Sequence, residues 1–160
     1  MLMFREMARR NQMLTKEECI EVLRKEPRGV LSVLGEDDYP YAVPINYWYN
    51  EENETLFFHS GMEGHKIDAI KKYDKVSFCV YDQGYRKDGD WALSIKSVII
   101  FGRIKIVENQ KKMIEFCREL SYKYTSDTEY IEEEIKKYTK NVLCFELIPE
   151  HMSGKLVREA

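Results

Sequence analysis

Residues 57–72 read FFHSGMEGHKIDAIKK and gather polar side chains at the boundary between an apolar run and a helical pattern. The stretch contains His59 and His65, two of the three histidines of the chain, together with Ser60 and Lys66. Side chains of these types could coordinate a metal, support a nucleophile or bind an anion.

The spacing of these residues weighs against the first two kinds of site. A zinc site needs three or four His, Cys or carboxylate ligands, whereas His59 and His65 lie six positions apart with two glycines between them. Ser60 directly follows His59, and adjacent strand residues point to opposite faces, so the imidazole is badly placed to take the hydroxyl proton. We therefore expect neither a metal site nor a catalytic side chain here.

An anion site would use more of the residues in this stretch. A helix that begins near Gly64 or His65 presents unpaired N–H groups and a positive dipole end, to which Ser60 and Lys66 could add a hydroxyl and a charge. A lysine in the first turn opposes the helix dipole unless an anion lies there. The residues alone still leave open an ordinary strand-to-helix turn with an exposed lysine.

The composition of the 160 residues, 44% hydrophobic and 33% charged, is typical of one globular domain that spans residues 1–160. The 25 basic residues are scattered and are outnumbered by 28 acidic ones, which argues against a nucleic-acid partner. No apolar run approaches the roughly 20 residues of a membrane span, and MLMFREMARRNQ lacks the apolar region of a signal peptide. We expect a cytoplasmic protein without a membrane partner.

The four cysteines, Cys19, Cys79, Cys117 and Cys144, occur singly, without a C-x-x-C pair. Cys79 and Cys144 lie in strand-like runs and the other two in helical patterns. We expect reduced thiols that act as small buried hydrophobes.

The periodicity predicts a mainly β fold with helices. Thr15 and Glu18 form a capping box at the start of a helix over about residues 15–26. Strand patterns follow over 29–35, 41–50 and 55–60 as an antiparallel meander, and Pro44 predicts a sheet edge or bulge for the middle one. Further strand patterns cover 75–82, 91–108, with a bulge or corner at Gly102, and 141–149.

Helical patterns cover residues 65–73, 108–124 and 127–140. Six strands with hairpin spacing favour a small antiparallel barrel over about residues 29–148, followed by a C-terminal tail over 149–160. Neither G-x-G-x-x-G after a strand nor G-x-x-x-x-G-K-[ST] occurs, so the usual nucleotide motifs are missing.

Three segments, GVLSVLGEDDYPYAVPINYWYN, TLFFHSGMEGHKIDAIKKYDKVSFCVYD and KSVIIFGRIKIVE, carry a family resemblance over residues 27–109. In this order they resemble the FMN-binding split barrels related to pyridoxamine 5'-phosphate oxidase, especially the nitroimidazole-resistance branch. SGK at 153–155 is a weaker match. The resemblance implies a six-stranded split β-barrel that forms a homodimer with two shared flavin sites.

The resemblance also implies which residues bind the cofactor, FMN with FAD as an alternative. Residues 43–46 would run along the flavin ring and ribityl chain, 59–60 would lie beside the flavin, 65–66 would contact its phosphate, and 97–98 would close the site. The implied residues are Val43, Pro44, Ile45, Asn46, His59, Ser60, His65, Lys66, Ser97 and Val98.

Two departures from the family pattern bear on function. The chain ends HMSGKLVREA, without the arginine-rich segment with which the oxidases hold a substrate phosphate, which argues against oxidation of vitamin B6. The phosphate-contacting pair is His65–Lys66 instead of the usual Arg–Lys, so we expect weaker and more pH-sensitive flavin binding.

The resemblance implies an FMN-dependent oxidoreductase that passes electrons or hydride to a small-molecule acceptor such as a 5-nitroimidazole. Tyr47, Trp48 and Trp91 are candidate walls for that acceptor. One alternative is a non-catalytic flavin or haem binder, with His59 or His151 as an axial ligand. Another is an interaction module without a cofactor.

Overall fold

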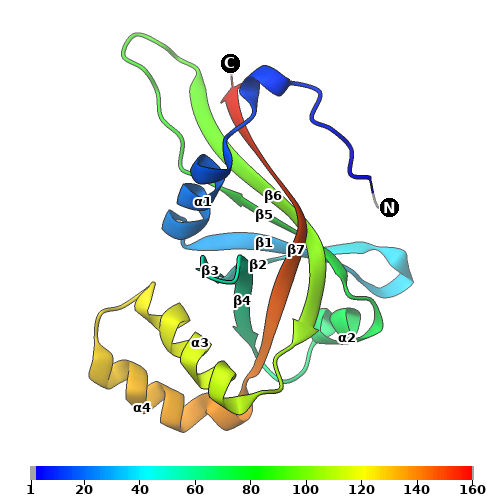
Figure 1. The fold of residues 1–160 in the computed structure, drawn as a ribbon, viewed down its shortest axis with the longest axis vertical. Helices are drawn as coiled ribbons and strands as arrows, with labels where there is room; N and C mark the ends of the chain where they lie inside the picture. The colour runs from blue at the N-terminus through cyan, green and yellow to red at the C-terminus, as the bar shows by residue number, and fades with distance from the viewer. Residues whose placement is uncertain (1–2, 160) are drawn as a thin grey trace.

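The computed structural model describes residues 3–159 and is built around one curled antiparallel sheet (Figure 1). Its strands are β1 (Arg28–Leu34), β2 (Pro40–Asn46), β3 (Trp48–Asn50), β4 (Thr55–Ser60), β5 (Lys75–Tyr81), β6 (Leu93–Ile106) and β7 (Leu143–Glu159). The helices of four residues or more are α1 (Lys16–Lys25), α2 (His65–Lys72), α3 (Gln110–Tyr122) and α4 (Thr128–Tyr138). Among residues 3–159, no helix is long and apolar enough to cross a membrane.

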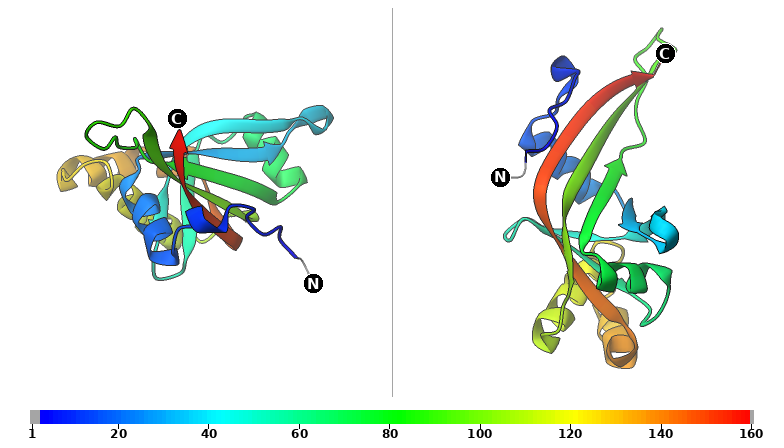
Figure 2. Two further views of the ribbon diagram at one scale, coloured as in Figure 1. Left: turned by 90° about the horizontal axis from the view of Figure 1, so that it is seen from above. Right: turned by 90° about the vertical axis from the view of Figure 1, so that its right-hand side faces the viewer.

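The strand order, β2-β1-β5-β6-β7-β4-β3, places β2 and β3 at opposite ends of the sheet, although only Tyr47 separates them in sequence. The sheet must therefore curl until its two ends meet, which produces a half-barrel open along one seam (Figure 2). The split-barrel prediction is confirmed.

The predictions of six strands and of a simple meander are wrong, because the pattern over 41–50 is not one strand. It breaks at Tyr47 into β2, which pairs with β1, and β3, which pairs with β4, so the sheet has seven strands. The edge position of Pro44 is confirmed, since β2 is an end strand and a missing N–H there removes no bond to a further strand.

Tyr47 is held at this break by several contacts. Its side chain is fully buried, and its hydroxyl donates to the carbonyl oxygen of Leu23 at 2.8 Å. Lys123 Nζ donates to the Tyr47 carbonyl at 3.0 Å and lies 3.5 Å from the centre of the Tyr47 ring. The Tyr47 N–H donates to the hydroxyl of Tyr124 at 3.2 Å. Lys123 and Tyr124, which follow α3, therefore hold Tyr47 in place where the two ends of the sheet meet.

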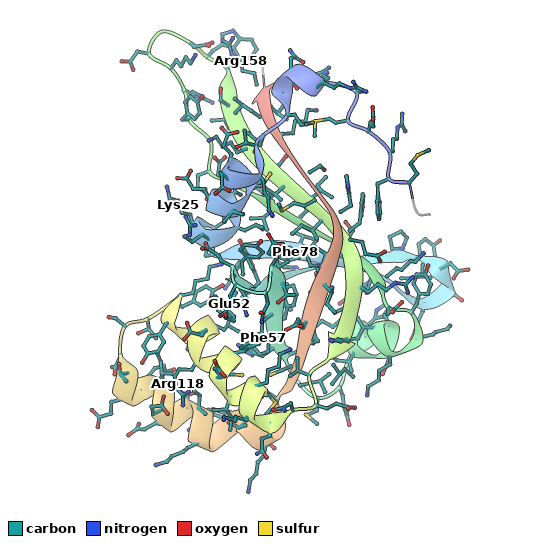
Figure 3. The ribbon with its side chains drawn as sticks, viewed as in Figure 1. Lys25, Glu52, Phe57, Phe78, Arg118 and Arg158 are labelled. Carbon is teal, nitrogen blue, oxygen red and sulfur yellow. The ribbon has the colours of Figure 1, made fainter. Side chains whose placement is uncertain are left out.

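Two apolar clusters lie on opposite faces of the sheet. Inside the barrel lies Phe78, which Figure 3 labels. Its ring meets those of Tyr47 and Phe58 edge-on, with centroids 5.0 and 5.2 Å apart. Outside it, Phe57 packs against Phe116 of α3. Consecutive residues of β4 thus serve two cores, as the alternation of side chains along a strand requires.

β6 and β7 pair along almost their whole length. The register shifts between Phe101 and Gly102, which confirms the predicted bulge, and a side chain at Gly102 would meet the backbone of Ile148. The expected C-terminal tail over 149–160 is wrong, because β7 continues to Glu159 through pairing with the first half of β6. The polar composition of this segment hid the strand, whose partner residues lie 47 to 66 positions earlier in the sequence.

Candidate functional site

The β4–α2 junction, which we define as residues 60–66, lies where β4 ends and α2 begins below the β1–β2 hairpin (Figure 1). Gly64 occupies the N-cap position with φ of 138°, a conformation that side chains disfavour, and a Cβ there would meet nothing within 4 Å. No side chain caps α2, so the N–H groups of its first turn have no acceptor within the helix. The predicted helix start and its open end are present.

Ser60 is buried, and its Oγ atom has no hydrogen-bond partner within the described part of the chain. It has the same orientation along β4 as Leu56 and Phe58, which belong to the core inside the barrel. A buried hydroxyl without a partner is costly unless a ligand or water satisfies it. Ser60 is therefore the residue of this junction that most clearly lacks a partner.

His65 is fixed against the β1–β2 turn. Its ring stacks on that of Tyr41 at 4.1 Å, and the Glu36 N–H donates to its Nε2 atom at 3.3 Å. A ring nitrogen that accepts a hydrogen bond has no proton to donate, so only Nδ1 can donate to a ligand in this arrangement. His65 thus holds α2 in place as well as lying at its open end.

Lys66 is half-buried in the first turn of α2 and forms no ion pair with any residue from 3 to 159. Lys71 and Lys72 lie in the last turn of the same helix, where a positive charge is favourable. Lys66 alone opposes the dipole, and its charge remains available to an anion.

The four predicted residues on β2 divide between its two faces. Val43 and Ile45 pack against the core, whereas Pro44 is exposed and the Oδ1 atom of Asn46 accepts a hydrogen bond from Arg28 Nε at 2.9 Å. The outer edge of β2 has no strand partner, and β2 and β4 lie in contact across the seam of the barrel. Backbone groups along the outer edge of β2 are therefore not used by a further strand of the described sheet.

The structure separates His59 from Ser60, although the sequence places them together. His59 lies on the face of β4 toward α3 and is opposite Cys144 of β7. Its side chain keeps contact with solvent, but the surrounding protein lowers its pKa by desolvation, which favours the neutral imidazole. His59 and Ser60 cannot both contact the same face of one ligand within a single chain.

Ser97 and Val98 lie on the first half of β6. Val98 is fully buried in the barrel core, so its side chain cannot reach a ligand outside the barrel. Ser97 points to the opposite, outer face, in a groove that β6 and β7 form with the N-terminal segment. The structure thus does not bring these two side chains to the β4–α2 junction of their own chain.

This outer groove has a volume of about 1090 Å³. The N-terminal segment runs alongside β7, where the Leu14 N–H donates to the Gly154 carbonyl at 2.9 Å (Figure 2). His151 stacks on Phe4 with ring centroids 4.8 Å apart. Sequence reasoning missed the groove because residues 3–14 have no periodicity that signals a docked segment.

The three residues predicted to form walls for an electron acceptor differ in their exposure to solvent. Tyr47 is fully buried, so the prediction that it forms a pocket wall is wrong. Trp48 packs edge-on against Phe116 at 5.2 Å, whereas Trp91 is exposed in the loop before β6. Trp91 alone of the three presents most of its side chain to solvent.

Comparison with solved structures finds the same fold in proteins of low sequence identity. A protein described as a candidate 5-nitroimidazole antibiotic resistance protein from Bacteroides thetaiotaomicron is 19% identical, with a TM-score of 0.77 over 92% of this chain and 87% of that one. A FAD-binding protein from Mesorhizobium loti is 22% identical, with a TM-score of 0.64 over 91% and 97%. A FAD- and haem-binding protein from Mycobacterium smegmatis is 16% identical, with a TM-score of 0.71 over 89% and 71%.

Comparison with curated protein sequences finds no match. The family model of pyridoxamine 5'-phosphate oxidase, however, matches residues 15–156, which include every strand of the barrel except the last three residues of β7. The chain therefore belongs to the pyridoxamine 5'-phosphate oxidase family.

Proposed function

We propose that this chain binds a flavin, with FMN as the first candidate and FAD as the alternative. The flavin phosphate would lie at the β4–α2 junction. The observation that carries the proposal is the unpartnered Ser60 Oγ, which is buried at the strand end beside an uncapped helix start. Structures of similar fold described as FAD-binding support the class of ligand.

The groups at the junction fit a phosphate. A phosphate accepts several hydrogen bonds, and the helix N–H groups, the Ser60 hydroxyl and the Lys66 ammonium are donors without known acceptors. The unpaired edge of β2 supplies backbone donors and acceptors for a planar ring. Ser60, Lys66 and β2 thus complement the two ends of a flavin mononucleotide.

We infer an oxidoreductase with a nitroaromatic such as a 5-nitroimidazole as a candidate acceptor, on the fold shared with the Bacteroides protein. A bound flavin supplies the redox chemistry through its own ring. The residues of this chain orient that ring and exclude water, and no acid or base from the chain is assigned to the reaction. Turnover of a nitroaromatic panel with chemically reduced flavin, under anaerobic conditions, tests this step separately from binding.

A homodimer with shared flavin sites is part of the proposal. Ile99 and Phe101 on β6 and Ile148 on β7 expose apolar side chains on the outer face of the sheet. A second copy that covers this face would also approach Ser97, which points to the same side. Residues 97–98 would then act across the interface instead of within one chain.

The first test compares FMN with riboflavin, which differs only in lacking the phosphate. Protein stripped of small molecules is titrated with each ligand and followed by flavin fluorescence. Because the proposed contacts are to the phosphate, FMN should bind at least tenfold more tightly than riboflavin. Equal affinities would refute the phosphate site but not flavin binding, whereas no binding of either ligand would refute both.

The second test replaces the charge at the junction. Lys66→Ala removes a charge-assisted contact and should weaken FMN binding by about 1.5 to 3 kcal/mol. Lys72→Ala is the matched control, because it removes the same charge from the other end of α2. A change of less than a factor of two for Lys66→Ala, or an equal loss for the control, would contradict the proposed phosphate site.

A second candidate function, haem binding without catalysis, is favoured by one observation. His151 lies in the large outer groove, within stacking distance of Phe4, and could serve as an axial ligand there. The Mycobacterium smegmatis protein of similar fold is described as binding both FAD and haem. A Soret band on addition of haem that is lost in His151→Ala would support this function, and its absence would exclude it.

A further inference from the structure

Two cysteines that the proposed flavin site does not use face each other across the second apolar cluster. Cys117 Sγ on α3 lies 3.5 Å from Cys144 Sγ on β7, and both thiols are free. They lie 27 positions apart in the sequence, and the segment between them includes all of α4. Both are free thiols in apolar surroundings, as expected, but their proximity gives the pair a chemistry that neither cysteine would have alone.

The two residues differ in exposure to solvent. Cys144 is 1% exposed, whereas Cys117 is only half-buried. A small oxidant should therefore react first with Cys117, with Cys144 behind it. This is the usual arrangement of a reactive cysteine and a resolving cysteine.

The electrostatics favour the same order. Hydrogen bonding with Cys144 lowers the pKa of Cys117, whereas the same contact and burial raise the pKa of Cys144. The thiolate is the reactive form of cysteine, so Cys117 is the more nucleophilic of the two. His59 lies directly opposite Cys144 on β4 and on the same face of the sheet.

We propose that Cys117 and Cys144 form a reversible disulfide and that hydrogen peroxide is the oxidant. The Cys117 thiolate attacks one peroxide oxygen, the O–O bond breaks, and hydroxide leaves, so Cys117 becomes a sulfenic acid. Cys144 then attacks the Cys117 sulfur, the S–O bond breaks, and the second oxygen leaves as water after taking up a proton. In total, two thiols lose two electrons and two protons, and one peroxide becomes two waters.

The bond would fasten α3 to β7 and close the segment 118–143 into a loop that contains α4. The same segment carries Lys123 and Tyr124, which bind the Tyr47 backbone where the two ends of the sheet meet. Oxidation would thus reinforce the attachment of this helical pair to the barrel. This inference does not depend on flavin binding.

The test uses the full-length protein. Reduced protein is exposed to stoichiometric peroxide, its free thiols are alkylated in denaturant, and tryptic peptides are analysed by mass spectrometry. We expect a linked pair of peptides containing Cys117 and Cys144, a mass loss of about 2 Da for the intact chain, and full reversal by dithiothreitol.

Cys117→Ser should abolish the linked peptides, whereas Cys79→Ser, which alters a half-buried cysteine on β5, should leave them unchanged. Two results would overturn the proposal. Both are measured on the wild-type chain, so they do not depend on whether a variant folds correctly. One is that both thiols remain alkylatable after peroxide treatment. The other is that Cys117 gains oxygen to the sulfinic acid without any link to Cys144.

Discussion

Ser60→Ala should raise the stability of the ligand-free protein but lower its affinity for FMN. The Ser60 Oγ is buried without a partner in the described structure, so its removal leaves no broken hydrogen bond. Because an unsatisfied buried hydroxyl costs about 1 to 3 kcal/mol, the free energy of unfolding of the ligand-free protein should rise by about 1 kcal/mol or more. By contrast, most substitutions of a buried polar residue lower the free energy of unfolding.

FMN binding should weaken in the same variant. A hydrogen bond from the hydroxyl to an ionised phosphate contributes about 1.5 to 3 kcal/mol. Its loss corresponds to a dissociation constant roughly 10- to 150-fold higher. Riboflavin, which has no phosphate, should bind the variant and the wild-type chain with the same affinity.

Urea unfolding of ligand-free protein measures the first effect, and fluorescence titration with each flavin measures the second. Thr55→Val is the matched control, since Thr55 Oγ1 is also buried without a partner, at the other end of β4. It should raise stability in the same way but leave FMN affinity unchanged. A Ser60→Ala variant that is less stable, or that binds FMN like the wild type, would refute the reasoning.

Three further perturbations test other parts of the structure. Burial lowers the pKa of Lys123 from 10.5 to about 8, so between these values the unfolded chain holds a proton that the folded chain lacks. Stability should therefore rise with pH in that window, and pH-dependent urea unfolding should show that Lys123→Met loses this increment. Phe101→Glu places a charge on the exposed apolar face of β6 and should convert the proposed homodimer to a monomer in light scattering, whereas Tyr130→Glu on α4 should not. Gly102→Ala brings a Cβ to 2.3 Å from the Ile148 carbonyl oxygen and should lower the free energy of unfolding by about 1 to 3 kcal/mol, measured by urea titration; unchanged stability would contradict the tight bulge.

The elements with strong local signals could be predicted from the sequence. The capping box at Thr15 and Glu18 is present, and the register shift lies at Gly102 as expected. Both features depend on residues a few positions apart or on one special residue, so their physical causes are visible in the sequence. The same holds for the open helix start after Gly64.

The features that sequence reasoning missed depend on distant partners. The break at Tyr47 could not be seen in an unbroken strand pattern, because it arises from the need of β2 and β3 to join opposite ends of the sheet. Residues 149–159 look like a polar tail until β6 provides the partner that makes them a strand. The orientation of Ser97 toward the outer groove likewise requires the paired sheet.

By itself, the sequence determined that Ser60, Gly64 and Lys66 lie at a strand-to-helix junction with unpaired donors, because helix ends and glycines act locally. Only the tertiary structure decided that Ser60 is buried without a partner, that His65 is fixed by Tyr41 and Glu36, and that His59 lies on the other face. It also decided that Cys117 and Cys144 meet. Burial and contact between residues remote in sequence are properties of the packed barrel, and no local pattern encodes them.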